Sequence, residues 1–380
     1  MLASLPRAAK ALLCVRVLNQ VGAYAIAFLA VFAGPARAPL VLVVFGVATL
    51  ISRWGGAFLL DRLPPRTVVA LGLASTGLAL TALSLSWEPV PVLISVALLG
   101  LSFEIYEPAT SELIAETAEG EVRQEVFGLL GASLVAAGAV AGVIAAVLLP
   151  VGVRWLVVVD AVTCFAAAAV AVLFLPAGGP RARRSGPRWR PPRDLLRDTA
   201  AATLFAVGHL AITMFTQAAL LQRGAPAWVP GVTLTAAALL SPPVMWATRR
   251  ALTPRPHRRV LSGGSAVAAL LSLFLAAPLP IPFTIAAYLA WSAAMAVLLG
   301  RWTALIADAA PEADRPRWFA FYGSSWGLAQ PAVPVAVALA TPVLPLPGQA
   351  PYALAAAAFL LVPAALRRPA VRPAPEPQVT

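Results

Sequence analysis

The sequence predicts an all-α membrane protein with twelve transmembrane helices in two six-helix halves. Hydrophobic residues make up 60% of the 380 residues, mean hydropathy is +0.84, and only 12% of the residues are charged, whereas soluble domains carry about 25%. Helices are the expected spanning element because a helix satisfies its own backbone hydrogen bonds in lipid. The placement of the cations and an internal repeat then predict the orientation and the two halves.

Twelve long apolar runs follow one another along the chain. Each is close to the roughly 20 residues that a helix needs to cross a bilayer, and turns rich in Pro, Gly and Arg separate them. Polar residues interrupt the first run, which favours a retained helix over a cleaved signal peptide. The expected spans are 11–33, 38–60, 66–86, 90–113, 125–149, 152–175, 200–222, 228–248, 259–277, 280–305, 318–341 and 349–366.

The cations gather on one side of this arrangement. With the N-terminus in the cytoplasm, the cytoplasmic segments hold 22 of the 28 Lys and Arg residues, and the outer segments hold three. Cytoplasmic loops of membrane proteins carry such an excess. We therefore expect a multi-pass protein of the cytoplasmic membrane with both termini inside. These cytoplasmic cations account for the net charge of +12, so no nucleic-acid partner is needed to explain it.

An internal repeat supports the division into halves. A shift of 192 residues superposes residues 113–133 on 305–325 without a gap, and pairs Arg123 with Arg315 and Gly131 with Gly323. Such an offset is typical of parallel structural repeats. The expected units are an N-terminal bundle, a cytoplasmic linker rich in Arg and Pro, and a C-terminal bundle with a short cytoplasmic tail. They cover residues 1–175, 176–199 and 200–380.

A charged turn between the second and third spans carries a family resemblance. Residues 55–66 read GGAFLLDRLPPR, which resembles the loop between helices 2 and 3 of the major facilitator superfamily, roughly G-x-L-A-D-R-x-G-R-R/K. Asp61, Arg62 and Arg66 match the pattern, and two patterned glycines are replaced. The resemblance implies the twelve-helix fold of that superfamily, of a bacterial drug or metabolite efflux type. It also implies that these three residues belong to a cytoplasmic gate.

Two acidic residues lie within the fourth span. Glu104 and Glu107 are three residues apart and share a helix face, and intramembrane charges are costly enough to suggest a function. Neighbouring carboxylates in a low dielectric oppose each other's ionisation, so one can load and release a proton near neutral pH. The resemblance implies that Arg16 of the first span faces one of them. A static ion pair, or pairing with Arg62 or Arg123, is the structural alternative.

Other polar and aromatic residues are candidates to line a substrate cavity. The candidates of the first span follow Arg16 at helical spacing and so share its helix face. Those of the seventh span also recur at helical spacing and form one polar face. Two interpretations of His209 stay open: it is a titrating residue that lines the cavity, or it forms a helix contact stabilised by hydrogen bonds. For the tenth span, core packing or lipid contact is the alternative to an aromatic pocket. The candidates are Asn19, Gln20, Tyr24, His209, Thr213, Gln217, Tyr288 and Trp291.

These features predict a secondary active transporter and no enzyme. The leading hypothesis is proton-coupled export of a small, fairly apolar compound by alternating access. Proton-coupled uptake of a nutrient or metabolite, and a transport-inactive scaffold or sensor, are the alternatives. The fifth span keeps Gly138 and Gly142 of a glycine pattern found in proton antiporters of the family but lacks its proline. The expected energy source is the proton gradient without a cofactor or metal, and the expected partners are the substrate and the lipid bilayer around a monomer.

Overall fold

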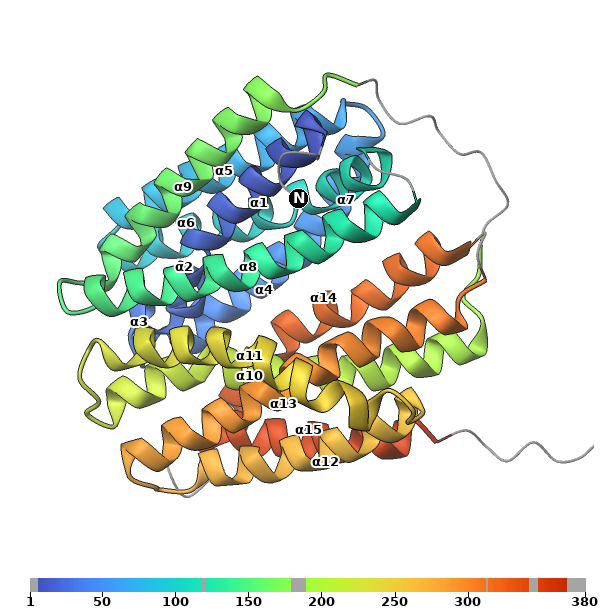
Figure 1. Cartoon of the computed structure of the whole chain (residues 1–380). Coiled ribbons are helices and arrows are strands. Elements are labelled where there is room, and N and C mark those ends of the chain that lie inside the picture. Colours follow the sequence, from blue (N-terminus) through green and yellow to red (C-terminus); the bar gives the residue numbers. More distant parts are fainter. Residues whose placement is uncertain (1–5, 118–119, 179–188, 312–313, 342–347, 368–380) are drawn as a thin grey trace, which may run out of the picture.

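The computed structural model describes residues 6–117, 120–178, 189–311, 314–341 and 348–367. Helices form nearly all of this part of the chain, and it contains no strand (Figure 1). The helices are α1 (Arg7–Gly22), α2 (Tyr24–Ala27), α3 (Leu29–Ala33), α4 (Ala38–Leu60), α5 (Pro65–Leu85), α6 (Pro89–Phe103), α7 (Tyr106–Thr117), α8 (Gly120–Leu148), α9 (Val153–Phe174), α10 (Arg193–Gln222), α11 (Val229–Leu252), α12 (His257–Ala276), α13 (Ile281–Ala309), α14 (Arg315–Ala340) and α15 (Ala350–Ala365).

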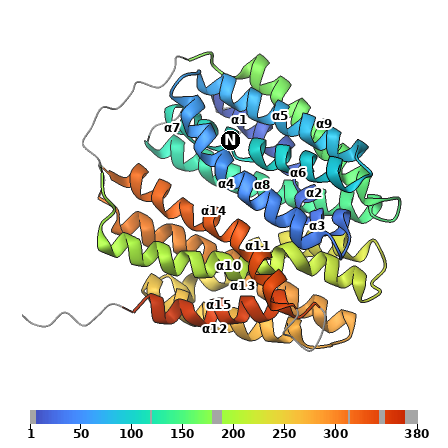
Figure 2. The ribbon, with the colours of Figure 1, turned by 180° about the vertical axis from the view of Figure 1, so that it is seen from behind.

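The helices form two bundles. In one, α9 packs against α1 and α5, and α6 packs against α4 and α5; in the other, α15 packs against α10 and α12. The bundles touch mainly where α8 meets α11 and where α4 meets α14. Figures 1 and 2 show α1–α9 on one side of this boundary and α10–α15 on the other. We call the end at which the described chain stops after residue 178 and resumes at 189 the linker end.

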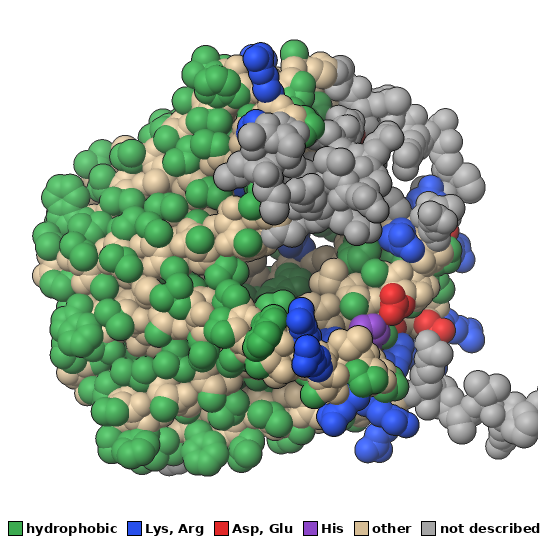
Figure 3. All heavy atoms as spheres, viewed as in Figure 1, with side chains coloured by type: hydrophobic (Ala, Val, Ile, Leu, Met, Phe, Trp, Pro, Cys, Tyr) green, Lys and Arg blue, Asp and Glu red, His purple; other side chains and the backbone are tan. Residues whose placement is uncertain are grey.

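The outer surface is suited to lipid. Within the described residues, nine helical segments are long and apolar enough to cross a membrane, and large hydrophobic side chains such as Trp54, Leu78 and Leu339 point outward and are exposed. Hydrophobic side chains cover most of the face in Figure 3, and Lys and Arg gather mainly toward the linker end. The prediction of an all-α membrane protein is therefore confirmed.

Two expected spans are broken helices. The range 11–33 contains α1, α2 and α3, and the range 90–113 contains α6 and α7, which separate at Glu104 and Ile105. The first break has no proline within the next turn, whereas Pro108 follows the second break: its nitrogen has no hydrogen to donate to the Glu104 carbonyl oxygen four residues earlier, and its ring crowds that oxygen. At the second break the Glu104 amide donates to Ser52 Oγ of α4 at 3.0 Å instead of continuing the helix. Pro108 thus interrupts the span, and the contact to another helix satisfies the amide that the break leaves free.

The expected linker is shorter than its predicted range. Helix α10 begins at Arg193, directly after Pro192, so the last residues of the range 176–199 are already helical. Proline favours a helix start because the first amides of a helix need no intrahelical acceptor. The centre of the linker, 179–188, and the tail from 368 lie outside the described residues.

An ion pair ties three helices of the second bundle together near the linker end. Arg258 of α12 donates from Nη2 to Asp198 Oδ2 of α10 at 2.7 Å and from Nη1 to the Leu366 carbonyl oxygen at 3.2 Å. The Asp198 side chain is only 2% exposed. Removing one partner of a buried pair costs about 3 kcal/mol.

We therefore expect Arg258→Ala to lower the melting temperature of the detergent-solubilised protein by several degrees. The matched control is Arg259→Ala, because Arg259 is the next residue on α12 and its side chain is exposed. Equal melting temperatures for the two variants would show that the ion pair does not stabilise the bundle.

Candidate functional site

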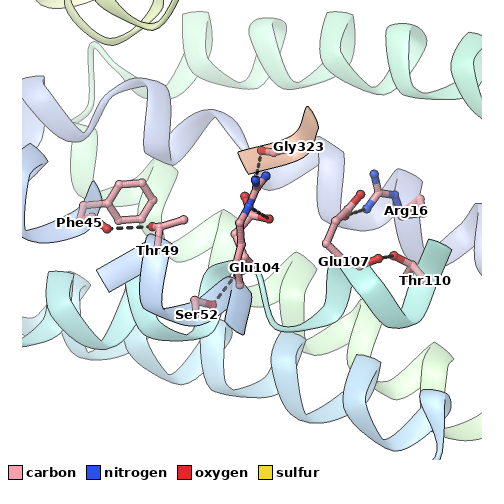
Figure 4. Close-up of polar contacts among 9 residues, drawn as sticks. Arg16, Phe45, Thr49, Ser52, Glu104, Glu107, Thr110 and Gly323 are labelled. Carbon is pink, nitrogen blue, oxygen red and sulfur yellow. Dashed lines mark hydrogen bonds and ion pairs between the residues drawn. The ribbon is translucent and has the colours of Figure 1, made fainter. Parts of the chain in front are cut away.

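The break between α6 and α7 places two acidic side chains at the boundary between the bundles. Glycines on the neighbouring helices make room for it: a Cβ on Gly56 of α4 would lie 2.7 Å from the Ile105 carbonyl oxygen, and one on Gly72 of α5 would lie 2.9 Å from the Tyr106 amide nitrogen. Figure 4 shows Glu104 and Glu107 on either side of the break, the first near Gly323 and the second beside Arg16.

Glu104 is paired with an arginine that also reaches the other bundle. Arg53 Nε of α4 lies 3.3 Å from Glu104 Oε2, and Arg53 Nη1 donates to the Gly323 carbonyl oxygen of α14. The side chains of Arg53 and Glu104 are 30% and 16% exposed. A planar guanidinium can hold two acceptors at once, so this ion pair is also a direct link between the bundles.

Glu107 is paired with Arg16 of α1. The Arg16 guanidinium also lies 5.7 Å from the centre of the Tyr106 ring, a distance typical of a cation–π contact. The Glu107 side chain is 42% exposed although the helix lies within a predicted span, and the face seen in Figure 3 is hollowed between the bundles. This second pair is therefore accessible to water or a ligand.

The other candidates of the first span lie around the break in its helix. Asn19 Nδ2 donates to the Tyr106 hydroxyl at 2.9 Å. The carbonyl oxygen of Gln20 accepts a hydrogen bond from the Ala23 amide at the end of α1. Tyr24 begins α2, and its hydroxyl lies 3.4 Å from where a Cβ on Gly138 of α8 would be. Asn19 thus joins the ion-pair region, whereas Tyr24 points toward α8.

His209 of α10 lies among aromatic rings of the second bundle. Its ring centre is 5.3 Å from those of Trp291 and Trp326 and 6.5 Å from that of Phe205. Trp291 is 1% exposed and packs at 5.7 Å against Tyr288. His209 Nδ1 and Trp291 Nε1 are both buried and lack a hydrogen-bond partner.

The same part of the second bundle contains a buried amide. Gln217 is fully buried, and its side-chain amide interacts with the Tyr288 hydroxyl. Thr213 instead uses its hydroxyl locally, donating to the His209 carbonyl oxygen at 3.1 Å. Buried polar groups normally have a partner, so His209 Nδ1 and Trp291 Nε1 are unusual among the buried atoms of the second bundle. Tyr288 and Trp291 themselves belong to the core of this bundle.

The bundles meet most tightly where two glycines face each other. A Cβ on Gly231 of α11 would lie 2.2 Å from the Ala146 amide nitrogen of α8, and one on Gly142 of α8 would lie 2.3 Å from Thr235 Oγ1. Thr235 Oγ1 also lies 3.2 Å from the Ala139 carbonyl oxygen, to which it can donate. These contacts hold α8 and α11 together at the end opposite the linker end.

The expected gate residues are not engaged with the other bundle in this structure. Asp61 is exposed, and no hydrogen bond or ion pair of its side chain occurs among the described residues. Arg62 lies over the Phe58 ring at 3.5 Å, and Arg66 Nη1 lies 3.5 Å from the Leu175 carbonyl oxygen of the same bundle. Their role in a gate stays a prediction.

The structure thus brings some candidates together and adds one. Arg16 meets Glu107, while Glu104 meets Arg53 rather than Arg62. Sequence reasoning did not select Arg53, although a cation within an apolar span is as unusual as the two acids. The glycine pair Gly323 and Gly327, which faces Arg53, was a second signal. The described residues contain no cluster of three or more His, Cys, Asp or Glu side chains able to hold a metal.

Comparisons with known proteins agree with this architecture. The family model described as Major Facilitator Superfamily matches residues 12–232, and no curated protein matches the sequence. Similar solved structures are an auto-inhibited POT family peptide transporter (14% identity, 97% of this chain, 99% of that chain, TM-score 0.78), a POT family transporter in complex with 5-aminolevulinic acid (13%, 94%, 95%, 0.77) and the nucleoside transporter NupG (9%, 94%, 98%, 0.75). At these identities the likeness concerns the fold alone. Because the family model covers more than half of the chain, the protein belongs to the Major Facilitator Superfamily and is a secondary transporter rather than an enzyme.

Proposed function

We propose that this transporter exports a small, fairly apolar compound in exchange for protons. The observation that carries the proposal is the pair of carboxylates on one broken helix, each held by an arginine at the boundary between the bundles. Intramembrane acids on discontinuous helices are typical of coupling-ion sites. Of the aromatic cluster around His209, Tyr288 and Trp291 are buried in the core and Trp326 is partly exposed, so Trp326 is the ring that supports a substrate with a large apolar part.

We place the protein in the cytoplasmic membrane with both termini inside, on the basis of the Lys and Arg distribution. The linker end then faces the cytoplasm. The close contact between α8 and α11 lies on the outer side, and the hollow between the bundles (Figure 3) opens inward. In this orientation the structure corresponds to the inward-facing state, in which a substrate enters from the cytoplasm.

Protonation of Glu104 provides a means of coupling. A neutral carboxyl attracts Arg53 less strongly, and Arg53 also holds the Gly323 carbonyl oxygen of the other bundle. A hydrogen bond to a charged group contributes roughly 1.5–3 kcal/mol. Its loss would change the balance between two conformations by roughly ten- to 150-fold. Glu107 is more exposed, so it exchanges protons with water more readily.

Uptake of a polar metabolite is the second candidate. The buried ring nitrogens of His209 and Trp291 that lack a hydrogen-bond partner favour a substrate that forms hydrogen bonds. Peptide and nucleoside transporters share the fold. A transport-inactive scaffold or sensor is the third hypothesis, and it predicts no flux of substrate or protons.

Proton flux in everted vesicles tests the proposal. We expect lipophilic drugs or organic cations to dissipate an imposed pH gradient when the wild type is present. We expect Glu104→Gln to reduce the initial rate at least tenfold, while Glu88→Gln, at an exposed position just before α6, leaves it unchanged.

The other outcomes separate the alternatives. If dissipation of the pH gradient survives Glu104→Gln but is lost in Glu107→Gln, the proton-binding residue is Glu107 rather than Glu104. Substrate accumulation in right-side-out vesicles driven by an inward proton gradient would establish uptake and contradict export. No flux of either kind, combined with full tolerance of Asp61→Asn, would favour the scaffold.

A further inference from the structure

A third intramembrane acid, Asp160, lies away from the two ion pairs. It occupies the middle of α9, is 3% exposed, and forms no ion pair among the described residues. The side-chain donor that reaches it is the Cys164 thiol, with Sγ 3.6 Å from Asp160 Oδ1. A thiol is a weak donor. An ionised carboxylate buried in this way would cost several kcal/mol, so the protonated acid is the stable form.

Few charged groups come near Asp160 from the surrounding helices. Helix α5 carries only Arg66, at its linker end, and neither α3 nor the described side chains of α8 include a titratable group. On α9 itself, Arg154 lies at the far start of the helix and donates to the Ser84 carbonyl oxygen at 2.8 Å. The titratable residues of α1 and α2 are Arg7, Lys10, Cys14, Arg16 and Tyr24.

The Asp160 carboxyl lies against the point where the first span breaks. Helix α1 ends at Gly22 and α2 begins at Tyr24. A Cβ on Gly22 would be 2.6 Å from Asp160 Oδ1 and 2.2 Å from Thr163 Oγ1, so only a glycine permits this approach. A movement of the first span at its break would therefore change the surroundings of Asp160 directly.

A chain of polar side chains leads from Asp160 to the exposed ion pair. Cys164 Sγ also lies 3.7 Å from Asn19 Oδ1, so its one proton can serve either acceptor. Asn19 Nδ2 donates to the Tyr106 hydroxyl. The Tyr106 ring lies beneath Arg16, and Arg16 pairs with Glu107. The chain crosses α9, α1 and α7, so a buried acid and a water-accessible acid share one network.

We propose that Asp160 is an occluded proton-binding site that exchanges its proton during transport. In the present conformation the carboxyl oxygen carries the proton. When the first span moves at its break, the oxygen–hydrogen bond breaks and the proton passes to water entering from the side of Glu107, leaving a carboxylate. This deepens the proposed proton coupling and rests on it. The Asp160 proposal also differs from the proposed function, because the coupling proton would not reside on Glu104 or Glu107 alone.

Infrared spectroscopy of the reconstituted full-length protein tests the proposal without a known substrate. The carbonyl stretch of a protonated carboxyl group is separate from the amide bands and shifts in deuterated water. At pH 7 we expect the wild type to show one such band that Asp160→Asn loses completely. Glu88→Gln should retain it. We also expect the band to disappear reversibly at alkaline pH.

Three results would overturn the proposal. A wild-type spectrum at pH 7 that equals that of Asp160→Asn would mean that the group is ionised. A band that persists unchanged at alkaline pH would mean a static structural acid. Should Asp160→Asn fail to fold, Cys164→Ser provides the assignment, because a hydroxyl is a stronger donor than a thiol and should shift the band to lower frequency. An unshifted band in Cys164→Ser would contradict the assignment to Asp160.

The infrared result and the vesicle result can fail separately. A titrating Asp160 band in a protein without proton flux would support the Asp160 site and contradict the proton-coupled function. Proton-coupled flux without the band would retain the function and remove this site.

Discussion

Gly231→Ala is expected to reduce transport roughly five- to 150-fold. The added Cβ would lie 2.2 Å from the Ala146 amide nitrogen and 2.6 Å from the Gly142 carbonyl oxygen. Both are backbone atoms, so no side-chain rotation relieves the overlap, and α8 and α11 must separate. Overpacking of this kind costs about 1–3 kcal/mol. Because the contact closes only one end of the transporter, that cost falls on the conformation described here and shifts the population away from it.

The matched control for this substitution is Gly131→Ala on α8, where an added Cβ would meet no atom within 4 Å. Initial transport rates in vesicles provide the first measurement. The distance between spin labels on α8 and α11 provides the second, and it should increase in Gly231→Ala only. Equal rates and equal distances in the two variants would show that the close contact of α8 and α11 is not required for the cycle.

Arg53→Ala is expected to abolish coupled transport. The substitution removes the link from α4 to the Gly323 carbonyl oxygen of α14, and it leaves Glu104, which is 16% exposed, without its arginine. Removing one partner of such a pair costs up to about 3 kcal/mol. This corresponds to a change of roughly 150-fold in the equilibrium between two conformations. Arg53→Lys should lie between Ala and the wild type, because an ammonium group lacks the planar fork that serves two acceptors.

A double-mutant cycle separates the two contributions of Arg53. In Arg53→Ala with Glu104→Gln, no charge is left unpaired, so the melting temperature in detergent should return close to that of the wild type while transport stays lost. Coupling energies for contacting residues are about 0.5–3 kcal/mol. The control is Arg250→Ala, at an exposed arginine of α11. Additive effects of the two substitutions on both melting and transport would contradict a functional pair.

The two predictions concern opposite ends of one boundary. Gly231 lies where the bundles touch backbone to backbone, and Arg53 lies nearer the linker end, where its side chain crosses the boundary. A transporter that alternates between two states needs contacts at each end that can form and break. A contact between glycines depends on shape and not on charge, whereas the Arg53 link depends on the charge of Glu104. Only the second can therefore respond directly to a proton.

The class of the protein and the positions of its polar residues could be predicted from the amino-acid sequence. Hydropathy and the low fraction of charge required helices in a membrane, and unusual residues in apolar runs marked Glu104, Glu107 and Arg16 as candidates. These conclusions hold because insertion into lipid depends on local composition, which is readable along the chain. The charged turn at Asp61 carried the family resemblance, which the match of the family model confirmed.

Which of these residues contact one another could not be predicted and follows from the packing of the helices. Pairing of Arg53 with Glu104 and of Arg16 with Glu107 depends on how each helix is rotated and where it breaks, and at the break the Glu104 amide donates to Ser52 of another helix. The approach of Gly22 to Asp160 likewise joins residues more than one hundred positions apart. Such contacts are set by the packing of whole bundles, for which local composition gives no register or rotation.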